Sequence, residues 1–500
     1  MSQIIYKNYR KDKCITIFFT GLHLLYEVLV NGLIEAEEKF LSEPKDFYSL
    51  ETKVKSQTEA FAAQFLATVL TSTDEQIYNS SWRKDRYTAQ RKDKRTLISS
   101  VGDVTFECTY YKKKSGGYAY LLEDVIGVDS YERFTEAAEV VLLTEAGKTS
   151  YAEAARTLPS KQKITKTTVM NKVHQISEMI PYEAPSIKKE CDYLFIEADE
   201  DHIAEQHGRY IPPEGNKGFI SRLIYVYEYK KIIPYKHPKK ELVNTFYFSG
   251  VYPGSDGVRL LWEEVRSFVE STYDTDQLKQ IFLTGDGANW IKTGTRYLYK
   301  SLFCLDKYHL MQYINTVAGQ MLDEKEITKS ELWHLLKQKS SSGFRDYTDL
   351  MLRSAENPTP IVALQKYVLG NWSATKRTMC NKIITGCSAE GHVSHVLSDR
   401  LSSRPMGWSQ KGADRMSKLR CFERNYGRDK IIDLVRYSRE SRRLKKTGTD
   451  VTVEIPKLKL HQIIAEHYDQ ASSYIERLQA TIPGITARKI ASIRMMLKLP

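Results

Sequence analysis

Two spacings of apolar residues divide the chain into helical and strand-rich parts. In residues 1–75, Leu22, Leu25, Val28, Leu29 and Leu33 recur on one face of a helix, and this spacing predicts helices. Residues 97–128 instead have the composition of short strands, with Gly116-Gly117 as a hairpin turn. The chain therefore begins with a helical region followed by a small β-rich segment.

Helical spacing returns in residues 134–180, where Pro159 to Lys163 interrupt it. Thr165 or Thr167 can cap the last helix of this segment. Short helices joined by a small turn predict a helix-turn-helix, with an ordinary helical bundle as the alternative. Its candidate DNA contacts are Lys163, Lys166, Thr168 and Lys172.

Residues 192–309 carry the strongest pattern. Continuous or alternating apolar runs predict strands, and two segments between them have the pattern of helices. The expected order is strand, strand, strand, helix, strand, short helix, strand, with the longer segments at residues 192–202, 218–230, 241–250, 259–271, 280–288 and 301–309. Residues 310–385 are mostly polar and helical, and a further helix begins at residues 388–392.

The charge of the chain favours a polyanionic partner. Its 500 residues have a formal net charge of +12 and a pI of about 9.0, as in many proteins that bind nucleic acid. Seven cysteines without a Cys-x-x-Cys pair suit a reducing compartment and argue against a disulfide scaffold or zinc ribbon. The apolar run at residues 14–30 continues into a helical pattern and has no clear cleavage site, which argues against a signal peptide. We expect a cytoplasmic, nucleoid-associated protein with no membrane span.

Residues 81–95 are strongly basic, with seven Lys or Arg and two Asp or Glu. A run of this kind is typical of a solvated linker. We predict a basic linker at this position.

Carboxylates stand at the ends of two predicted strands and on a late helix. Asp199 ends the first strand, Asp286 follows the fourth, and Glu390 lies on the helix that begins near residue 388. This order is that of a ribonuclease H-like sheet, in which the first strand is central and the fourth lies beside it. Three carboxylates at one place repel one another unless cations neutralise them. Two Mg²⁺ or Mn²⁺ ions about 4 Å apart would do so and would support in-line attack on a phosphate.

The first strand offers more than one candidate acid, and glycines flank the acid after the fourth strand. Asp201 and Glu197 lie on the same strand face as Asp199, so either could be the first acid, with Asp199 favoured over Asp201 and Glu197 third. Gly285 and Gly287 flank Asp286, and we expect them to leave room for metal and a phosphodiester backbone.

Four motifs occur in order along the chain: EADEDH, TGDGANWI, LDKYH and CSAEGHVSHVLSDRLSSRPMGWS. Together they resemble the ISLre-type insertion-sequence transposases, which are DDE transposases distantly related to the Mutator superfamily. The resemblance extends from about residue 95 to 440. It implies metal-dependent DNA strand transfer between transposon ends and a target, with Asp199, Asp286 and Glu390 as the catalytic triad.

The same resemblance concerns Asp306 and His309. Asp306-Lys307-Tyr308-His309 is similar to the Cys/Asp-x-x-His signature of related transposases, which implies a pair beside the triad that supports it or contacts DNA. The alternative is a helix start, with Asp306 as N-cap and His309 in the first turn.

A basic segment follows the last acid. Residues 399–446 hold fifteen Lys or Arg and six Asp or Glu, with aromatic residues between them. We predict a phosphate-binding track, the alternative being a solvated helical face. Its candidate contacts are Arg400, Arg404, Lys411, Arg415, Arg439, Arg442 and Arg443. His392 and His395 lack the further ligands that zinc needs.

The expected architecture is an α/β ribonuclease H-like core interrupted by an all-α insertion and preceded by helical and helix-turn-helix DNA-binding regions. The first parts expected are an N-terminal helical region (1–80), a basic linker with a small β-rich segment (81–130) and the helix-turn-helix (131–185). The core follows in two parts, the first at 190–310 and the final helix with the basic track at 386–446, with the helical insertion (311–385) between them. A helical tail (447–500) ends the given sequence. We expect double-stranded DNA as the partner and a homodimer or larger assembly, because two transposon ends are handled together. A nuclease or resolvase without joining activity and a catalytically inactive DNA-binding protein are the alternatives.

Overall fold

The computed structural model describes residues 13–176, 179–206, 218–234, 239–321, 324–384, 386–404 and 406–447. The predicted C-terminal helical tail, residues 447–500, lies outside the described residues except for Thr447. None of the helices in the described ranges is long and apolar enough to cross a membrane.

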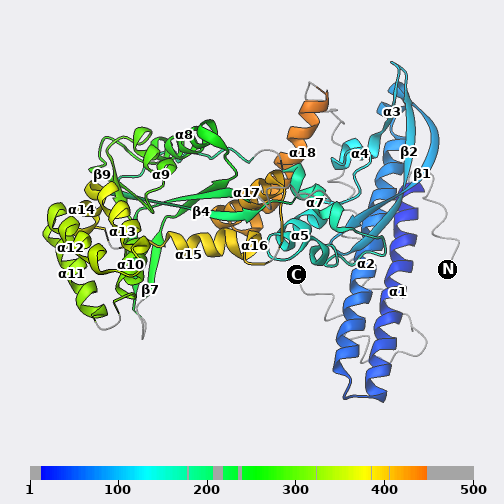
Figure 1. Cartoon of the computed structure of the whole chain (residues 1–500). Coiled ribbons are helices and arrows are strands. Elements are labelled where there is room, and N and C mark those ends of the chain that lie inside the picture. Colours follow the sequence, from blue (N-terminus) through cyan, green and yellow to red (C-terminus); the bar gives the residue numbers. More distant parts are fainter. Residues whose placement is uncertain are drawn as a thin grey trace.

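The N-terminal part is a helical hairpin with a small sheet on it (Figure 1). Helices α1 (Lys13–Ser42) and α2 (Phe47–Asn79) pack side by side, as their apolar spacing predicts. Strands β1 (Tyr87–Ser99), β2 (Gly102–Lys113) and β3 (Tyr118–Tyr120) form an antiparallel sheet against α2. Gly116 and Gly117 make the β2–β3 turn with φ of +102° and +85°, which only glycine adopts freely.

The prediction of a linker at residues 81–95 is wrong. Residues Ser81–Arg86 form helix α3, and β1 begins at Tyr87. The charged run Arg91 to Arg95 is continuous, but Asp93 and Arg95 are half-buried and pair with Tyr120 and Glu123. Composition alone does not reveal such partners, so the strand has the appearance of a solvated run.

The helices predicted between residues 134 and 180 are present. They are α5 (Glu136–Ala146), α6 (Tyr151–Ala154) and α7 (Lys166–Gln175), and α4 (Leu121–Ile126) precedes them. The Thr165 hydroxyl accepts from the Thr168 N–H and so caps α7. Apolar residues of α5 and α7, including Leu142 and Val169, pack in a core that α17 and α18 share.

A five-stranded sheet forms the centre of the second half. Its order is β10–β9–β4–β5–β8, with β5 and β8 antiparallel to their neighbours and β9 and β10 parallel to β4. The central position of β4, with β9 beside it, is the placement that the sequence predicts for the first and fourth strands. The strand bounds are Tyr193–Ala204 for β4, Gly218–Tyr227 for β5, Phe246–Gly250 for β8, Gln280–Gly285 for β9 and Ser301–Leu305 for β10. Strands β6 (Tyr229–Ile233) and β7 (Lys239–Val243) pair separately.

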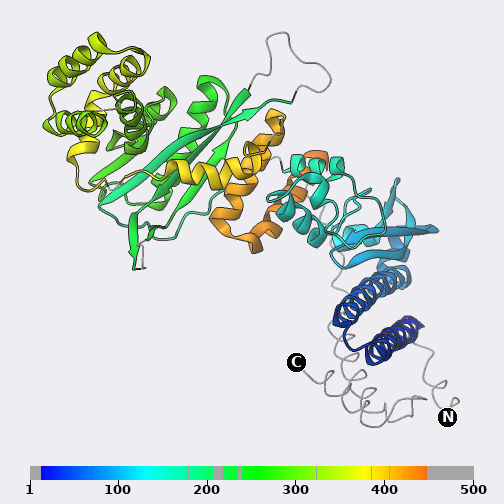
Figure 2. The ribbon, with the colours of Figure 1, turned by 60° about the horizontal axis from the view of Figure 1, so that its bottom comes forward.

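Helices cover both faces of this sheet (Figure 2). Leu194, Ile196 and Ala198 of β4 pack with α8 (Gly254–Thr272), whose Trp262 is fully buried. Because strand side chains alternate, Glu197, Asp199 and Asp201 face the opposite side. That side is covered by α15 (Ala389–Val393), the π-helical turn η3 (Ser394–Ser398), α16 (Asp399–Leu401) and α17 (Gln410–Tyr426).

An all-α unit with its own core lies between β10 and α15. It consists of α10 (Lys307–Ala318), α11 (Lys325–Gln338), α12 (Ser341–Ser354), α13 (Thr359–Gly370) and α14 (Trp372–Cys380). Short helices α9 (Asn289–Thr293) and η2 (Gly294–Arg296) follow β9, and η4 (Arg428–Lys430) leads into α18 (Ile431–Thr447). Helix α18 packs on α5, so the last described helix contacts the group of short helices α5 to α7 that precedes the five-stranded sheet.

Candidate active site

Asp199, Asp286 and Glu390 lie around one place. Asp199 is on the central strand and is 8% exposed, Asp286 follows the last residue of β9, and Glu390 is in the first turn of α15. Burial raises the pKa of Asp199 to about 7, and the charges of Asp286 and Glu390 add to this shift. Charges act in this way only over short distances, so the fold gathers the three predicted acids.

The three acids do not form a closed cluster by themselves. Within the described part of the chain, no three His, Cys, Asp or Glu side chains stand close enough together to hold a metal ion. The Asp199 carboxylate accepts a hydrogen bond from the Glu200 N–H, with 2.9 Å between the nitrogen and Oδ1. The Asp286 carboxylate accepts from the Ala288 N–H at 2.8 Å. The donor set of carboxylate oxygens is nevertheless the one that Mg²⁺ and Mn²⁺ prefer.

Asp306 and His309 combine the two roles considered for them. Asp306 is buried and caps α10, accepting from the N–H groups of Tyr308 and His309. Its Oδ2 also lies 2.8 Å from His309 Nδ1. This hydrogen bond raises the pKa of His309, and the charges of Asp306, Asp199 and Asp286 raise it further. His309 is therefore both a first-turn residue and a neighbour of two of the acids.

Glu197 is a structural carboxylate. It is 1% exposed and accepts hydrogen bonds from the hydroxyls of Tyr225 and Tyr227, and Lys230 Nζ lies 3.0 Å from its Oε1. Ser388 donates to Oε2 through its backbone N–H at 2.6 Å and its hydroxyl at 3.1 Å. Burial alone would raise the pKa of Glu197, but Lys230 and these hydrogen bonds outweigh it and lower the pKa. The sequence does not reveal this role, because these partners lie on other elements.

Asp201, the alternative first acid, is also held by the protein. It is 6% exposed, and the hydroxyls of Ser398 and Ser402 donate to its Oδ1 at 3.1 and 2.7 Å. Glu197 therefore binds Ser388, and Asp201 binds Ser398 and Ser402, so the two acids hold the segment of residues 388–402 against β4. Asp199 lies between them, and among the described residues the hydrogen bond that its carboxylate accepts comes from the Glu200 backbone.

The expectation that Gly285 and Gly287 leave room for metal and DNA is wrong. A Cβ at Gly285 would lie 2.7 Å from Ile291 Cδ1 and 2.9 Å from the Ala198 carbonyl oxygen. Gly287 has a φ of +96°, and the Asn371 amide lies 3.1 Å from the position of its Cβ. The first glycine permits close packing of β9 against β4 and α9, and the second permits the turn after Asp286.

Comparison with known proteins places the chain in a family. Residues 41–436 match the model of an uncharacterised protein family, UPF0236. The chain belongs to this family. It is 31% identical over 399 residues to a UPF0236 protein of Caldanaerobacter subterraneus subsp. tengcongensis, covering 79% of this chain and 82% of the relative.

Two further similarities extend this result. A second UPF0236 protein of the same organism, whose name joins eleven locus designations, is 31% identical and covers 78% of this chain and 80% of its own length. Among solved structures, the Drosophila P element transposase strand transfer complex matches with a TM-score of 0.21 and 10% identity, over 62% of this chain and 82% of that chain.

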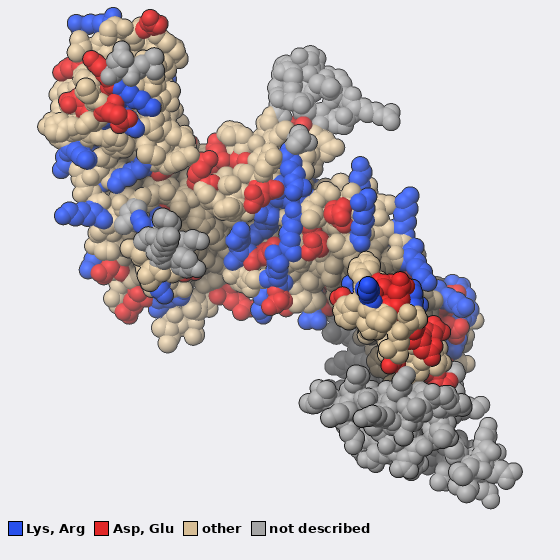
Figure 3. Space-filling view, turned by 90° about the horizontal axis from the view of Figure 1, so that it is seen from below, with Lys and Arg blue, Asp and Glu red and all other residues tan. Residues whose placement is uncertain are grey.

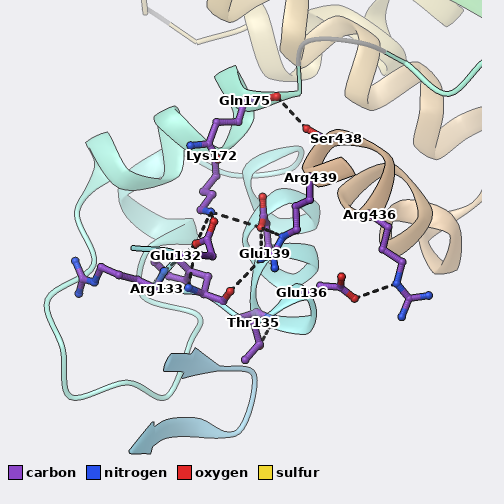
Figure 4. Close-up of polar contacts among 12 residues, drawn as sticks. Glu132, Arg133, Thr135, Glu136, Glu139, Lys172, Gln175, Arg436, Ser438 and Arg439 are labelled. Carbon is purple, nitrogen blue, oxygen red and sulfur yellow. Dashed lines mark hydrogen bonds and ion pairs between the residues drawn. The ribbon is translucent and has the colours of Figure 1, made fainter. Parts of the chain in front are cut away.

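Three basic residues predicted to contact DNA are buried in this UPF0236 chain, and that prediction is wrong for them. Lys172 Nζ lies 2.8 Å from the Glu132 carboxylate and 3.5 Å from Glu139 (Figure 4). Arg439 lies 2.6 Å from Glu139 and is 3% exposed. Arg400 is 5% exposed and donates from Nε to the Ala146 carbonyl oxygen at 2.8 Å. A desolvated cation needs a partner within the protein, so these side chains stabilise the fold and do not reach phosphates.

The other side chains predicted to contact DNA differ in their exposure to solvent. Lys163, Lys166, Arg404 and Lys411 are exposed. Arg415 and Arg443 are paired with Asp414 and Asp129, Thr168 is half-buried beside Thr165, and Arg442 is half-buried. Figure 3 shows Lys and Arg side chains gathered over the middle of one face, with acidic side chains among them. Of the candidate contacts in the basic track at residues 399–446, Arg404 and Lys411 are therefore the exposed ones.

Proposed function

We propose that this chain is a DDE transposase of the ISLre type, which binds transposon ends and catalyses DNA cleavage and strand transfer. The observation that carries the proposal is the gathering of Asp286 and Glu390 around the desolvated Asp199. Glu197 is enclosed by protein donors, and Asp201 accepts from Ser398 and Ser402 at Oδ1, while its Oδ2 has no hydrogen-bond partner among the described residues. We favour Asp199 as the acid of β4 that binds a ligand, because the charges of Asp286 and Glu390 act on it.

The sheet supports a ribonuclease H-like core. Three antiparallel strands, β4, β5 and β8, with the separate β6–β7 pair between the last two, are followed by a helix and two strands parallel to β4, which is central. The first two acids stand on β4 and directly after β9, which are neighbours in this sheet. The all-α unit between β10 and α15 is then an insertion before the helix with the third acid.

The proposed cofactors are two Mg²⁺ or Mn²⁺ ions held by Asp199, Asp286 and Glu390. When bound, such ions activate a water or 3′-hydroxyl and stabilise the leaving oxygen. The raised pKa of Asp199 is what a desolvated acid has before a cation neutralises it. His309, whose pKa is also raised, can carry a proton beside the acids and donate a hydrogen bond to a phosphate oxygen.

The relatives' names add a further argument. One relative has a name that joins eleven locus designations of a single organism. A protein encoded at many places in one genome is what repeated transposition leaves behind. The inference for this chain is that it also belongs to a mobile element.

The proposed partner is double-stranded DNA. Lys163 and Lys166 are exposed at the start of α7, where a recognition helix of a helix-turn-helix makes its base contacts. Arg404, which follows α16, and Lys411, in the first turn of α17, are exposed and would contact phosphates. We infer a homodimer or larger assembly on two ends, in the cytoplasm and associated with the nucleoid.

Incubating the purified chain with labelled element ends, unlabelled target DNA and Mg²⁺ tests the proposal. Joined products are expected, and Asp286→Asn should yield none. Cut but unjoined ends would instead assign a nuclease or resolvase. A shifted but intact band would assign a DNA-binding protein without catalysis.

A further inference from the structure

One face of β2 ends in a row of tyrosines. Val104 and Phe106, earlier on the same face, are buried in the core, whereas Thr109 on the opposite face hydrogen-bonds to Asp74 of α2. In the row the Tyr110 and Tyr118 rings stack, with centroids 5.2 Å apart and planes 6° apart. Tyr120 also contacts Tyr110, at 4.8 Å between centroids. Tyr118 at the end of the row is 55% exposed, so one of its ring faces is open to a ligand.

This row is fixed in place by polar contacts. The Arg91 guanidinium lies 4.5 Å from the Tyr110 ring centroid. Asp93 holds Arg91 through its Nε at 2.9 Å and also accepts from the Tyr120 hydroxyl at 2.6 Å. Side chains that are already ordered lose little conformational entropy when a ligand binds. The face is therefore preorganised rather than a loose collection of exposed rings.

Positive charge lies beside the tyrosine row. Residues 81–118 hold ten Lys or Arg and four Asp or Glu, a surplus of six. Lys112 of β2 is exposed on the tyrosine face, whereas the exposed Lys92 and Lys94 of β1 pair with Thr109 and Glu107 and so lie on the opposite face. Lys112 stands directly opposite Tyr118 in the β2–β3 register. A cation beside an open ring face matches a nucleotide, which offers a phosphate next to a base.

We propose that this face of the β1–β2–β3 sheet binds single-stranded DNA, with Tyr118 stacking on an unpaired base and Lys112 contacting the backbone. In a duplex the base faces are covered by neighbouring bases, so an exposed ring gains nothing there, whereas unpaired bases stack on aromatic side chains without regard to sequence. The sheet lies toward the opposite end of the molecule from β9, with β4 between them (Figure 1). The inference does not depend on the proposed catalytic function, because a chain that cuts no DNA can still bind a single strand here.

Fluorescence anisotropy with a labelled oligothymidine and with a duplex of equal length tests this assignment. Tyr118→Ala should weaken oligothymidine binding by about tenfold and leave duplex binding unchanged, because only unpaired bases use the ring. Tyr118→Phe keeps the ring and should bind as the wild type does. Tyr48→Ala, which removes a 79% exposed tyrosine from α2, is the matched control and should change neither affinity.

Three results would overturn the proposal: no oligothymidine binding by the wild type, unchanged binding by Tyr118→Ala, or an equal loss for the duplex. Should Tyr118→Ala fail to fold, Lys112→Glu replaces it and should weaken oligothymidine binding more at low salt than at high salt. A wild type that binds the single strand but never joins ends would reject the transposase and retain this site.

Discussion

The carboxylate of Glu197 accepts a hydrogen bond from the backbone N–H of Ser388, with 2.6 Å between the nitrogen and Oε2. Ser388 directly precedes α15, the helix with Glu390 in its first turn. Glu197 belongs to the central strand, two residues before Asp199. The distance between the first and third acids is therefore set by a buried carboxylate that is not one of them.

Glu197→Gln should destabilise the protein by about 3–5 kcal/mol, because it leaves Lys230 as a buried charge without its partner. The Lys230 side chain is 9% exposed, so water cannot replace the missing carboxylate. Urea unfolding measures the effect. Adding Lys230→Met should restore part of the stability, and a double variant no more stable than Glu197→Gln would contradict this account.

Asp199→Asn, Asp286→Asn and Glu390→Gln should each abolish cutting and joining while duplex affinity is kept, since each removes one proposed metal-binding charge. Asp201→Asn is the matched comparison within the same strand. Its Oδ1 accepts from Ser398 and Ser402, and an Asn carbonyl oxygen can accept the same hydrogen bonds, so this variant should keep both the fold and the activity. Strand-transfer assays and thermal melts of all four variants check this, and full activity in any of the first three removes that residue from the site.

Without divalent metal, Asp199 should make the protein less stable at high pH. Its folded-state pKa of about 7 lies above an unfolded value of about 3.9, so the folded state binds more protons between these values. The free energy of unfolding therefore falls as the pH rises across this window. Asp199→Asn should raise the melting temperature in EDTA, and by more at pH 8 than at pH 5. An equal increase at both pH values would show that Asp199 titrates normally.

His309→Ala should slow strand transfer by at least about tenfold, or about 1.4 kcal/mol of transition-state stabilisation. The reason is that Asp306 holds His309 in a place where the charges of Asp199 and Asp286 act on it. Rates on intact and pre-nicked DNA separate cutting from joining. His395→Ala, which changes a histidine that is 72% exposed, is the control. Wild-type rates for both steps in His309→Ala would leave it only its place in the first turn of α10.

Duplex affinity should fall with salt, and the exposed cations should account for part of the slope. Replacing Arg404 and Lys411 together with Ala should reduce the slope of log K against log salt by about 0.9 for each phosphate that the variant no longer neutralises. Arg439→Ala should instead destabilise the fold, because the Phe134 carbonyl oxygen loses its Arg439 donor and Glu139 keeps only the longer contact with Lys172. Titrations at several salt concentrations and urea unfolding distinguish the two classes. An unchanged slope in the double variant would remove both residues from the interface.

The strands and their acids were predictable because each buried strand is a continuous apolar run that ends at a polar residue. The runs before Asp199 and Asp286 predict the starts of β4 and β9 to within one residue. Asp199 is not the end of its strand as predicted, because β4 continues to Ala204, and β9 ends at Gly285. The choice among Glu197, Asp199 and Asp201 was not decidable by pattern, since all three share one strand face. What separates them are partners such as Ser388 and Ser402, about 200 residues further along the chain.

Charge misled the prediction where composition was counted without partners. The basic segment at residues 399–446 contains Arg439, whose carboxylate partner Glu139 is 300 residues away. Residues 87–95 have the composition of a linker, although they pair with β2 as a strand. In both cases the missing information was which face of the element is covered, and only tertiary packing determines that.

The buried ion pair between Glu139 and Arg439 also has a consequence for how the chain is made. The two residues are 300 positions apart, and at about 5–20 residues per second a ribosome needs roughly 15–60 s to pass from one to the other. During this interval α5 and α7 lack the helix that completes their packing. A chain stopped before α18 should therefore be cleaved by proteases within residues 131–176, where the full chain is protected. We expect the helices proposed to read transposon ends to reach their final packing only after the part with the carboxylates has been synthesised.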